Sequence, residues 1–162
     1  MSPRAAARLE ALGFAPVYDY VAGKADWGSF GLPLEGRRPS RTRVGAHVRS
    51  DAPACRADDP MATVRERVRA EGWDTCFVTN EDGVVVGRLG RAALAAEDDV
   101  SVEAAMSLGP STVRPSLELD KAVVRMRKQN LTSLPVTRSD GVLVGVLRRE
   151  DAEQALASTE GT

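Results

Sequence analysis

The pattern of apolar residues predicts the same strand-turn-strand unit twice. Apolar runs flank the pair Asp82-Gly83, and equivalent runs flank Asp140-Gly141. An Asp-Gly pair between two apolar runs is typical of a tight hairpin turn. The copies superimpose without a gap at a spacing of 58 residues, so that Val78 matches Val136 and Gly87 matches Gly145. An internal repeat of this kind predicts two equivalent structural units.

Helices are predicted on both sides of each hairpin. The helix before the first hairpin starts at Pro60 and ends at Gly72, with an apolar face. In the second copy Asn130 stands where Gly72 stood, and both residue types tolerate the left-handed stop of a helix. The remaining segments of the two copies are short opening helices (Val44–Arg49 and Val102–Met106), extended pieces (around Cys55 and Ser111–Pro115) and closing helices (Arg91–Glu97 and Arg149–Ala157).

The N-terminal segment, residues 1–36, has a different pattern. Ser2-Pro3 and Gly13 bound an alanine-rich stretch that predicts a helix, Val17–Val21 predicts a short strand, and the residues from Gly23 predict a loop. Five of the seven aromatic residues lie here: Phe14, Tyr18, Tyr20, Trp27 and Phe30. About forty residues cannot bury such side chains alone. We expect this arm to pack against the C-terminal module, its own or a dimer partner's; a loose tail is the alternative.

The stretch LEALGFAPVYDYVAGKADWGSFGLPLEG, from Leu9 to Gly36, resembles the C-terminal third of a rhodanese-like domain. That resemblance implies persulfide chemistry on a cysteine placed before the helix, but the first cysteine of the chain is Cys55. The arm is therefore interpreted as a structural remnant, or as the end of a longer ancestral reading frame in which Met1 was internal. Residues 37–43 contain four arginines and predict a solvated linker.

The repeated unit with its Leu134-Pro135-Val136 strand, its Asp-Gly turn and the ending Gly145 to Asp151 resembles the CBS domain, and two units resemble a CBS-domain pair, or Bateman module. The resemblance covers residues 44–157 and implies an α+β fold of two tandem units, 44–97 and 98–157, followed by a tail, 158–162. Because each unit alone leaves one sheet face bare, the units are expected to pack through their sheets.

The resemblance also implies a nucleotide site in the cleft between the units. Asp151 would accept hydrogen bonds from a ribose diol, and Arg148 stands where the family has a hydroxyl. Arg148 could clamp phosphate or pair with a nearby carboxylate. The other residues implied are Thr112 and Val113, whose extended backbone would hydrogen-bond an adenine edge. The stretch Leu131 to Pro135, with Leu134 and Pro135, would form the apolar wall, and the hydroxyl of Ser133 would lie near the opening. The equivalent polar positions of the first copy are lost, at Gly90 and Ala93.

The two charged residues of this site, Asp151 and Arg148, could also have roles that involve no ligand. Asp151 could simply favour the dipole at the start of the last helix, and Arg148 could be a surface residue. Under the ligand interpretation, the expected ligands are AMP, ADP, ATP or S-adenosylmethionine.

Composition and charge exclude several classes of function. A net charge of −1 without a basic face argues against nucleic-acid binding, and the apolar runs are far shorter than a membrane span, which favours a cytoplasmic protein. Two cysteines, Cys55 and Cys76, and the single histidine His47 do not form a metal-binding pattern. No nucleophile-base set or phosphate loop is found, so we expect no catalytic residues and no enzyme.

The sequence thus predicts a regulatory or sensor protein, a homodimer associating through helices, that responds to an adenosyl ligand and signals to an unidentified protein partner. A ligand-free interaction module is the alternative, in which Trp27 or Tyr20 of the arm fills the cleft. A third hypothesis is a sulfurtransferase accessory role inherited from the rhodanese-like arm.

Overall fold

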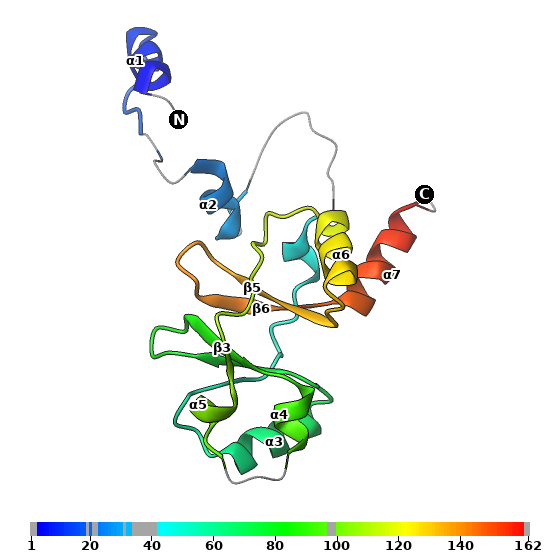
Figure 1. The fold of residues 1–162 in the computed structure, drawn as a ribbon. Helices are drawn as coiled ribbons and strands as arrows, with labels where there is room; N and C mark the ends of the chain where they lie inside the picture. Colours follow the sequence, from blue (N-terminus) through cyan, green and yellow to red (C-terminus); the bar gives the residue numbers. More distant parts are fainter. Residues whose placement is uncertain are drawn as a thin grey trace.

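The computed structural model describes residues 3–18, 20, 23–30, 32–33, 42–96 and 100–160. Figure 1 shows two stacked units, with α2 above the second unit and α1 set apart from both. The elements are α1 (Pro3–Ala11), α2 (Gly23–Ser29), the 3₁₀ helix η1 (Val44–His47), β1 (Ala54–Cys55), α3 (Met61–Ala70), β2 (Cys76–Thr79), β3 (Val85–Leu89), α4 (Arg91–Ala95), α5 (Val102–Ala105), β4 (Ser107–Leu108), α6 (Leu119–Lys128), β5 (Ser133–Thr137), β6 (Leu143–Arg148) and α7 (Arg149–Glu160).

The predicted hairpins are confirmed, and the two copies match in detail. Strands β2 and β3 pair antiparallel, as do β5 and β6, and each pair has a register shift at the same repeat position, after Val78 and after Val136. The turn glycines Gly83 and Gly141 have φ values of 77° and 87°, a region that glycine enters without steric cost. The first sheet has the order β1-β2-β3-β4 and the second the order β5-β6.

The two helices that precede the hairpins end in the same way, as the sequence predicted. Gly72 and Asn130 have φ values of 67° and 49°. The next amide donates back into the helix in both copies, from Trp73 to the carbonyl of Val68 and from Leu131 to that of Met126. These bonds satisfy carbonyls that a helix end would otherwise leave without a partner. The left-handed residue therefore turns the chain directly into β2 or β5.

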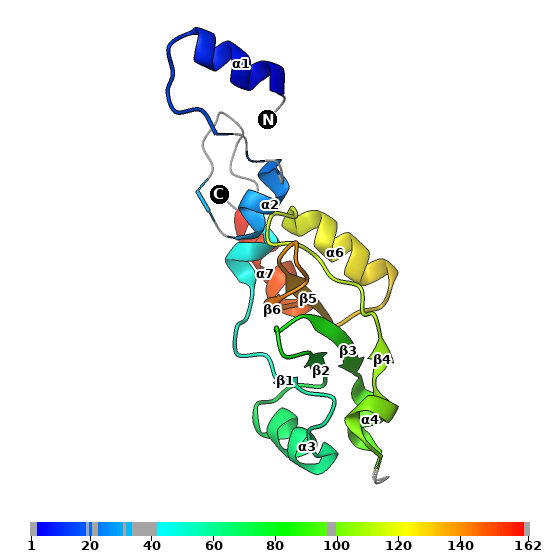
Figure 2. The ribbon, with the colours of Figure 1, turned by 90° about the vertical axis from the view of Figure 1, so that its left-hand side faces the viewer.

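The opening segments of the two units are exchanged in space. Val44 of η1 is fully buried in the core of the second unit, and Val102 of α5 is fully buried in the core of the first. The segment after η1 forms a bridge from Arg49 to Val146 in β6, while β4 pairs with β3. Each unit thus completes its core and its sheet with residues from the other, and the view in Figure 2 lets the reader follow both crossings.

Two glycines at equivalent repeat positions permit these crossings. A Cβ on Gly87 would lie 2.4 Å from the sulfur of Met106, and a Cβ on Gly145 would lie 2.4 Å from the carbonyl oxygen of Arg49 and 2.5 Å from a methyl of Val48. All three distances are below van der Waals contact. The repeat therefore keeps a bare backbone where the exchanged segment passes over the strand.

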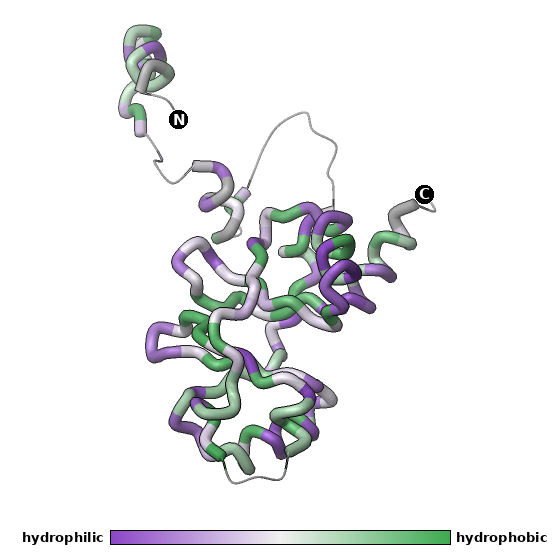
Figure 3. Tube along the Cα trace, in the orientation of Figure 1, coloured by the Kyte–Doolittle hydropathy of each residue, from purple (hydrophilic) through white to green (hydrophobic). Residues whose placement is uncertain are grey.

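The hairpin tips join the two sheets. The amide of Val85 donates to the carbonyl of Gly141, and the amide of Leu143 donates to that of Gly83, at 3.1 and 3.0 Å. Val146 of β6 belongs to the core of the first unit. Figure 3 shows apolar segments along the strands and polar segments at the turns and on α6. The predicted association of the units through their sheets is confirmed in this form.

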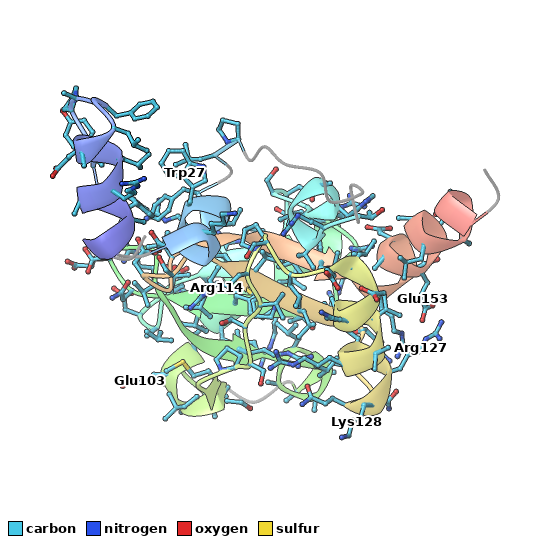
Figure 4. All side chains as sticks on the ribbon, turned by 90° about the horizontal axis from the view of Figure 1, so that it is seen from above. Trp27, Glu103, Arg114, Arg127, Lys128 and Glu153 are labelled. Atoms are coloured by element: carbon cyan, nitrogen blue, oxygen red, sulfur yellow. The ribbon has the colours of Figure 1, made fainter. Side chains whose placement is uncertain are left out.

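The outer helices of the second unit cover its core. The buried face of α6 consists of Leu119, Ala122, Val123 and Met126. Arg127 of α6 and Glu153 of α7 form an ion pair at 2.8 Å, and Figure 4 shows both side chains on the same outer edge. Since these two side chains are exposed, the pair adds little to the free energy of unfolding.

The arm differs from its prediction in two ways. Val17, Tyr18 and Tyr20 belong to no strand, and the other residues of the expected strand, Asp19 and Val21, lie outside the described residues. An isolated extended segment becomes a strand only when it finds a partner, and the described part of the chain offers none here. The second difference is that the expected loop after Gly23 contains a helix, α2.

The expectation that the arm packs on the C-terminal module is confirmed for α2 alone. The hydroxyl of Ser139, in the turn between β5 and β6, donates to the carboxylate of Asp26. The guanidinium of Arg138 lies 5.1 Å from the ring centroid of Phe30. By contrast, Phe14 and Tyr18, which follow α1, are 60% and 80% exposed.

Candidate functional site

Two cavities lie between the units at equivalent places of the repeat. The first, here named the Arg88 cleft, has a volume of about 460 Å³ and is lined by Arg88, Gly90, Ser107, Pro110, Ser111, Gln129, Leu131, Ser133, Leu134 and Pro135. The second, here named the Trp73 cleft, has a volume of about 490 Å³ and is lined by Gly72, Trp73, Asp74, Thr132, Ser133, Arg148, Arg149, Glu150 and Glu153. Each cleft combines the start of one hairpin with the end of the other.

The Arg88 cleft has an apolar wall made by the start of β5. The left-handed stop at Asn130 directs Leu131 into the strand, and Leu134 is 1% exposed. Pro135 lacks an amide hydrogen, but its carbonyl accepts from the amide of Val113 at 3.0 Å. The parallel bridge between Val113 and Val136 fixes the wall from behind. A flat apolar wall of this kind suits the face of a planar ring.

The described polar side chains that line the Arg88 cleft can all donate hydrogen bonds, and none of them is a carboxylate. Ser107, Ser111 and Ser133 supply hydroxyls, Gln129 an amide and Arg88 a guanidinium. Within the described part of the chain, Ser133 Oγ and Arg88 Nε are buried and have no hydrogen-bond partner. An unsatisfied buried polar atom costs about 1–3 kcal/mol. Arg88 and Ser133 both line this cleft, so an anion bound there would lie beside both residues.

In the Trp73 cleft, a side chain of the protein covers the face of the indole ring. The guanidinium of Arg148 lies 3.8 Å from the ring centroid of Trp73, and its Nη2 donates to the carbonyl of Gly72 at 3.1 Å. Arg49 lies 5.8 Å from the same ring centroid. Cations over an indole face are attracted by its quadrupole. Arg148 thus makes a cross-unit contact on the ring face that a planar ligand would otherwise use.

Carboxylates surround this arginine pair. Arg49 is bound to Asp51 at 2.8 Å and faces Asp151 at 3.8 Å. The hydrogen bonds donated by Arg49 hold the pKa of the Asp51 carboxyl below its usual range. Asp151 therefore lies at the first turn of α7 beside a cation, with 37% of its side chain exposed.

The residues predicted for one nucleotide site are divided between two places. Leu134 and Pro135 line the Arg88 cleft, Arg148 lines the Trp73 cleft, and Ser133 borders both. Asp151 lies on the Arg148 side, through its contact with Arg49. The structure brings the wall residues together and separates them from the two charged residues.

Thr112 and Val113 lie behind the wall and line neither cleft. The carbonyl of Thr112 faces Arg125 at 3.5 Å. Val113 is 4% exposed, and its amide and carbonyl are bound to Pro135 and Thr137. Its backbone is thus already used within the sheet. A role of these two residues toward a ligand stays a prediction.

Sequence reasoning missed Arg88, Ser107, Ser111 and Gln129, as well as the partner of Arg148, Trp73. The Arg88 cleft takes Ser107 from β4, which pairs with β3 of the other unit, and the repeat pattern does not reveal this exchange. The repeat does contain one usable signal. Gly72-Trp73-Asp74 matches Asn130-Leu131-Thr132 at the spacing of 58 residues, so the two helix stops mark equivalent cavity edges.

Other kinds of site find little support in the described residues. No group of three or more His, Cys, Asp or Glu that could hold a metal ion occurs among them. Over the same residues, none of the helices has the length and apolar character that crossing a bilayer demands. Cys55 and Cys76 are buried free thiols. A free cysteine behaves as a small apolar residue and is often buried.

Comparison with known proteins identifies the fold of the repeated units. Residues 99–158 match the family model of the CBS domain, and this segment is the second copy of the repeat. Solved CBS-domain pairs superimpose on both copies: CBSX2 in complex with AMP has a TM-score of 0.67 at 20% identity, over 73% of this chain and 98% of that one. The chain has the fold of a CBS-domain pair. A search of curated proteins finds no match.

Two further CBS structures show the range of this fold. The CBS-domain pair of protein MJ0100, in complex with 5′-methylthioadenosine and S-adenosyl-L-methionine, has a TM-score of 0.66 at 17% identity, over 73% of this chain and 98% of that one. The cytosolic domain of the Mg²⁺ channel MgtE, in complex with ATP, has a TM-score of 0.64 at 22% identity, over 70% of this chain and 48% of that one. This chain therefore spans about half of the MgtE domain.

The rhodanese-like resemblance of the arm is not supported. The family match begins at residue 99, and the solved structures above are CBS proteins. The strand on which the resemblance depended is not formed at its described residues. A helix followed by aromatic residues is too common a pattern to identify a domain, and the sulfurtransferase hypothesis is not retained.

Proposed function

We propose that this CBS-pair protein is a regulatory module that binds an adenine nucleotide in the Arg88 cleft. The observation that carries the proposal is the pair of buried, unpartnered polar atoms, Ser133 Oγ and Arg88 Nε, at one cavity. The complexes of its structural neighbours with AMP and ATP support the ligand class. Because a guanidinium without a neutralising carboxylate favours anions, AMP, ADP and ATP are expected to bind more tightly than the cationic S-adenosylmethionine.

The residues of the cleft divide into two roles. Leu131, Leu134 and Pro135 would hold the base by apolar contact. Arg88 would bind phosphate, with Ser107 and Ser111 donating further hydrogen bonds. Ala93, at the position where the second copy has Asp151, offers no acceptor for a ribose diol. Recognition would therefore depend on phosphate more than on ribose.

Regulation would follow from the place of the ligand between the units. The wall belongs to the second unit and Arg88 to the first, so a bound nucleotide alters how the two units are held together. A tenfold preference for one arrangement shifts the equilibrium by about 1.4 kcal/mol. Homodimerisation, a protein partner that receives this shift and a cytoplasmic location stay predictions, and no catalytic role is proposed.

The test is isothermal titration of the full chain with AMP, ADP, ATP and S-adenosylmethionine. The Arg88→Gln variant is expected to weaken AMP binding by about tenfold, because a charge-assisted hydrogen bond contributes about 1.5–3 kcal/mol. Arg149→Gln is the matched control, since Arg149 lines the other cleft. Equal affinity of both variants and the wild type would place the ligand elsewhere.

A ligand-free interaction module is the second candidate, favoured by the Arg148 guanidinium that covers the Trp73 ring in the Trp73 cleft. The aromatic residues of the arm do not fill either cleft: Trp27 donates to the carbonyl of Pro33 and Tyr20 to Asp26. If none of the nucleotides binds at millimolar concentration, this candidate replaces the first.

A further inference from the structure

A third cavity lies between the arm and the second unit. It has a volume of about 740 Å³ and is separate from the Arg88 and Trp73 clefts, with which it shares no lining residue. Phe30 and Leu32 of the arm form one wall, and Leu143 and Val144 of β6 form part of the opposite wall. Clefts of this volume are typical of small-molecule sites. We name it the arm cavity.

The walls of the arm cavity expose large apolar side chains to solvent. Phe30, Leu32 and Val144 are 44%, 40% and 39% exposed. Their apolar surface favours any occupant that removes it from water, at roughly 25 cal/mol for each Å². An apolar body is therefore the first requirement on a ligand.

The charged residues of the cavity are both arginines. Arg43 and Arg138 line it, and no Asp or Glu does so among the described residues. Arg138 is paired with Asp140 at 2.8 Å and lies over the ring of Phe30. In the part of the chain that the structure describes, Arg43 donates to the carbonyl of Ser116 at 2.7 Å and forms no ion pair with a carboxylate. The positive charge of Arg43 therefore has no neutralising partner there.

The arm wall is held in place without a ligand. Ser139 donates to Asp26 of α2, and Trp27 of the same helix donates to the carbonyl of Pro33 at 2.9 Å. The second bond fixes the chain on both sides of Phe30 and Leu32. A ligand would thus meet a wall that is already formed, which reduces the entropy lost on binding.

We propose that the arm cavity binds a small molecule with an apolar body and one acidic group. The acidic group would pair with Arg43, and the body would lie between Phe30 and Leu32 on one side and Leu143 and Val144 on the other. Carboxylate and phosphate heads share this chemistry. The proposal does not depend on nucleotide binding in the Arg88 cleft.

The test is isothermal titration of the full chain with octanoate, octyl phosphate and, as the uncharged match, octan-1-ol. At least one of the acids is expected to bind once per chain and about tenfold more tightly than the alcohol. The stronger of the two acids identifies the head group. Arg43→Gln is expected to remove that advantage, whereas Arg56→Gln, an exposed arginine of the first unit that lines none of the cavities, should leave it unchanged.

Thermal melting of both variants shows whether they are folded as the wild type is. Equal binding of acid and alcohol, or an acid affinity that Arg43→Gln does not alter in a folded protein, would overturn the proposal. Absence of binding at millimolar octanoate and octyl phosphate would do so as well.

Discussion

At Gly145 the fold requires a residue without a Cβ. The carbonyl of Arg49 passes so close to Gly145 that any side chain would collide with the backbone of the exchanged segment. The sequence placed Gly87 and Gly145 at the same repeat position, but it did not show what each glycine faces. That information lies in a contact between segments about a hundred residues apart, which no local pattern contains.

Replacing Gly145 by alanine is expected to destabilise the protein by about 2 kcal/mol or more, because the backbone of Arg49 must move. Gly90→Ala is the matched control, since a Cβ at Gly90 would meet no atom within 4 Å. Urea unfolding of the two variants measures the difference. Similar midpoints for both would contradict the close approach.

Arg148 is the residue whose role the sequence left most open. Both hypotheses, phosphate clamp and carboxylate pair, considered only the second copy, whereas its partner Trp73 belongs to the first. Arg148→Met keeps most of the aliphatic stem and removes the cation, so we expect a loss of about 1 kcal/mol in the free energy of unfolding. Arg149→Met is the control, and its loss should stay below about 0.5 kcal/mol. Chemical denaturation measures both values. An equal loss in the two variants would refute the stacking of Arg148 on Trp73.

At the scale of elements, the pattern of apolar and polar residues predicted the helices and strands of the repeated units far better than those of the arm. The hairpins, α3 and α6 have clear periodicity and defined stops, so their positions follow from local chemistry. α2 has only seven residues and is held by contacts with a turn in the second unit. A helix that depends on tertiary contacts cannot be predicted from its own propensity.

The docking of α2 is expected to depend on the protonation of Asp26. Hydrogen bonds donated by Ser139 and then by Tyr20 hold the pKa of this carboxyl below its ordinary value. A lowered pKa means that the ionised form favours the docked arm above about pH 3.9. This contribution is lost as the pH falls through the pKa of the docked state.

An NMR titration of the Asp26 carboxyl carbon measures this effect. Ser139→Ala should raise the pKa toward its ordinary value because the hydrogen bond that lowers this pKa most is gone. Ser158→Ala, which removes a hydroxyl on α7 that bonds within its own helix, should leave the titration unchanged. An unshifted pKa in the Ser139 variant would contradict the docking.

At the scale of the whole molecule, the exchange of opening segments makes two repeats into one folding unit. The boundaries 44–97 and 98–157 follow the chain, whereas each core takes a residue from the other copy. We expect Val44→Ala, which truncates a fully buried side chain of the second core, to cost about 1–3 kcal/mol in one cooperative urea transition. Val124→Ala, 66% exposed on α6, is the control; two separate transitions for the Val44 variant would contradict a shared core.

The central claim, an adenine nucleotide in the Arg88 cleft, is tested most directly by mapping the amide chemical shifts of the labelled protein during a titration with AMP. The account predicts that the largest changes fall on residues 107–111, 129–135 and 88–90, which surround that cleft. Changes centred instead on residues 72–74 and 148–153, around the Trp73 cleft, or no changes at millimolar AMP, would contradict it.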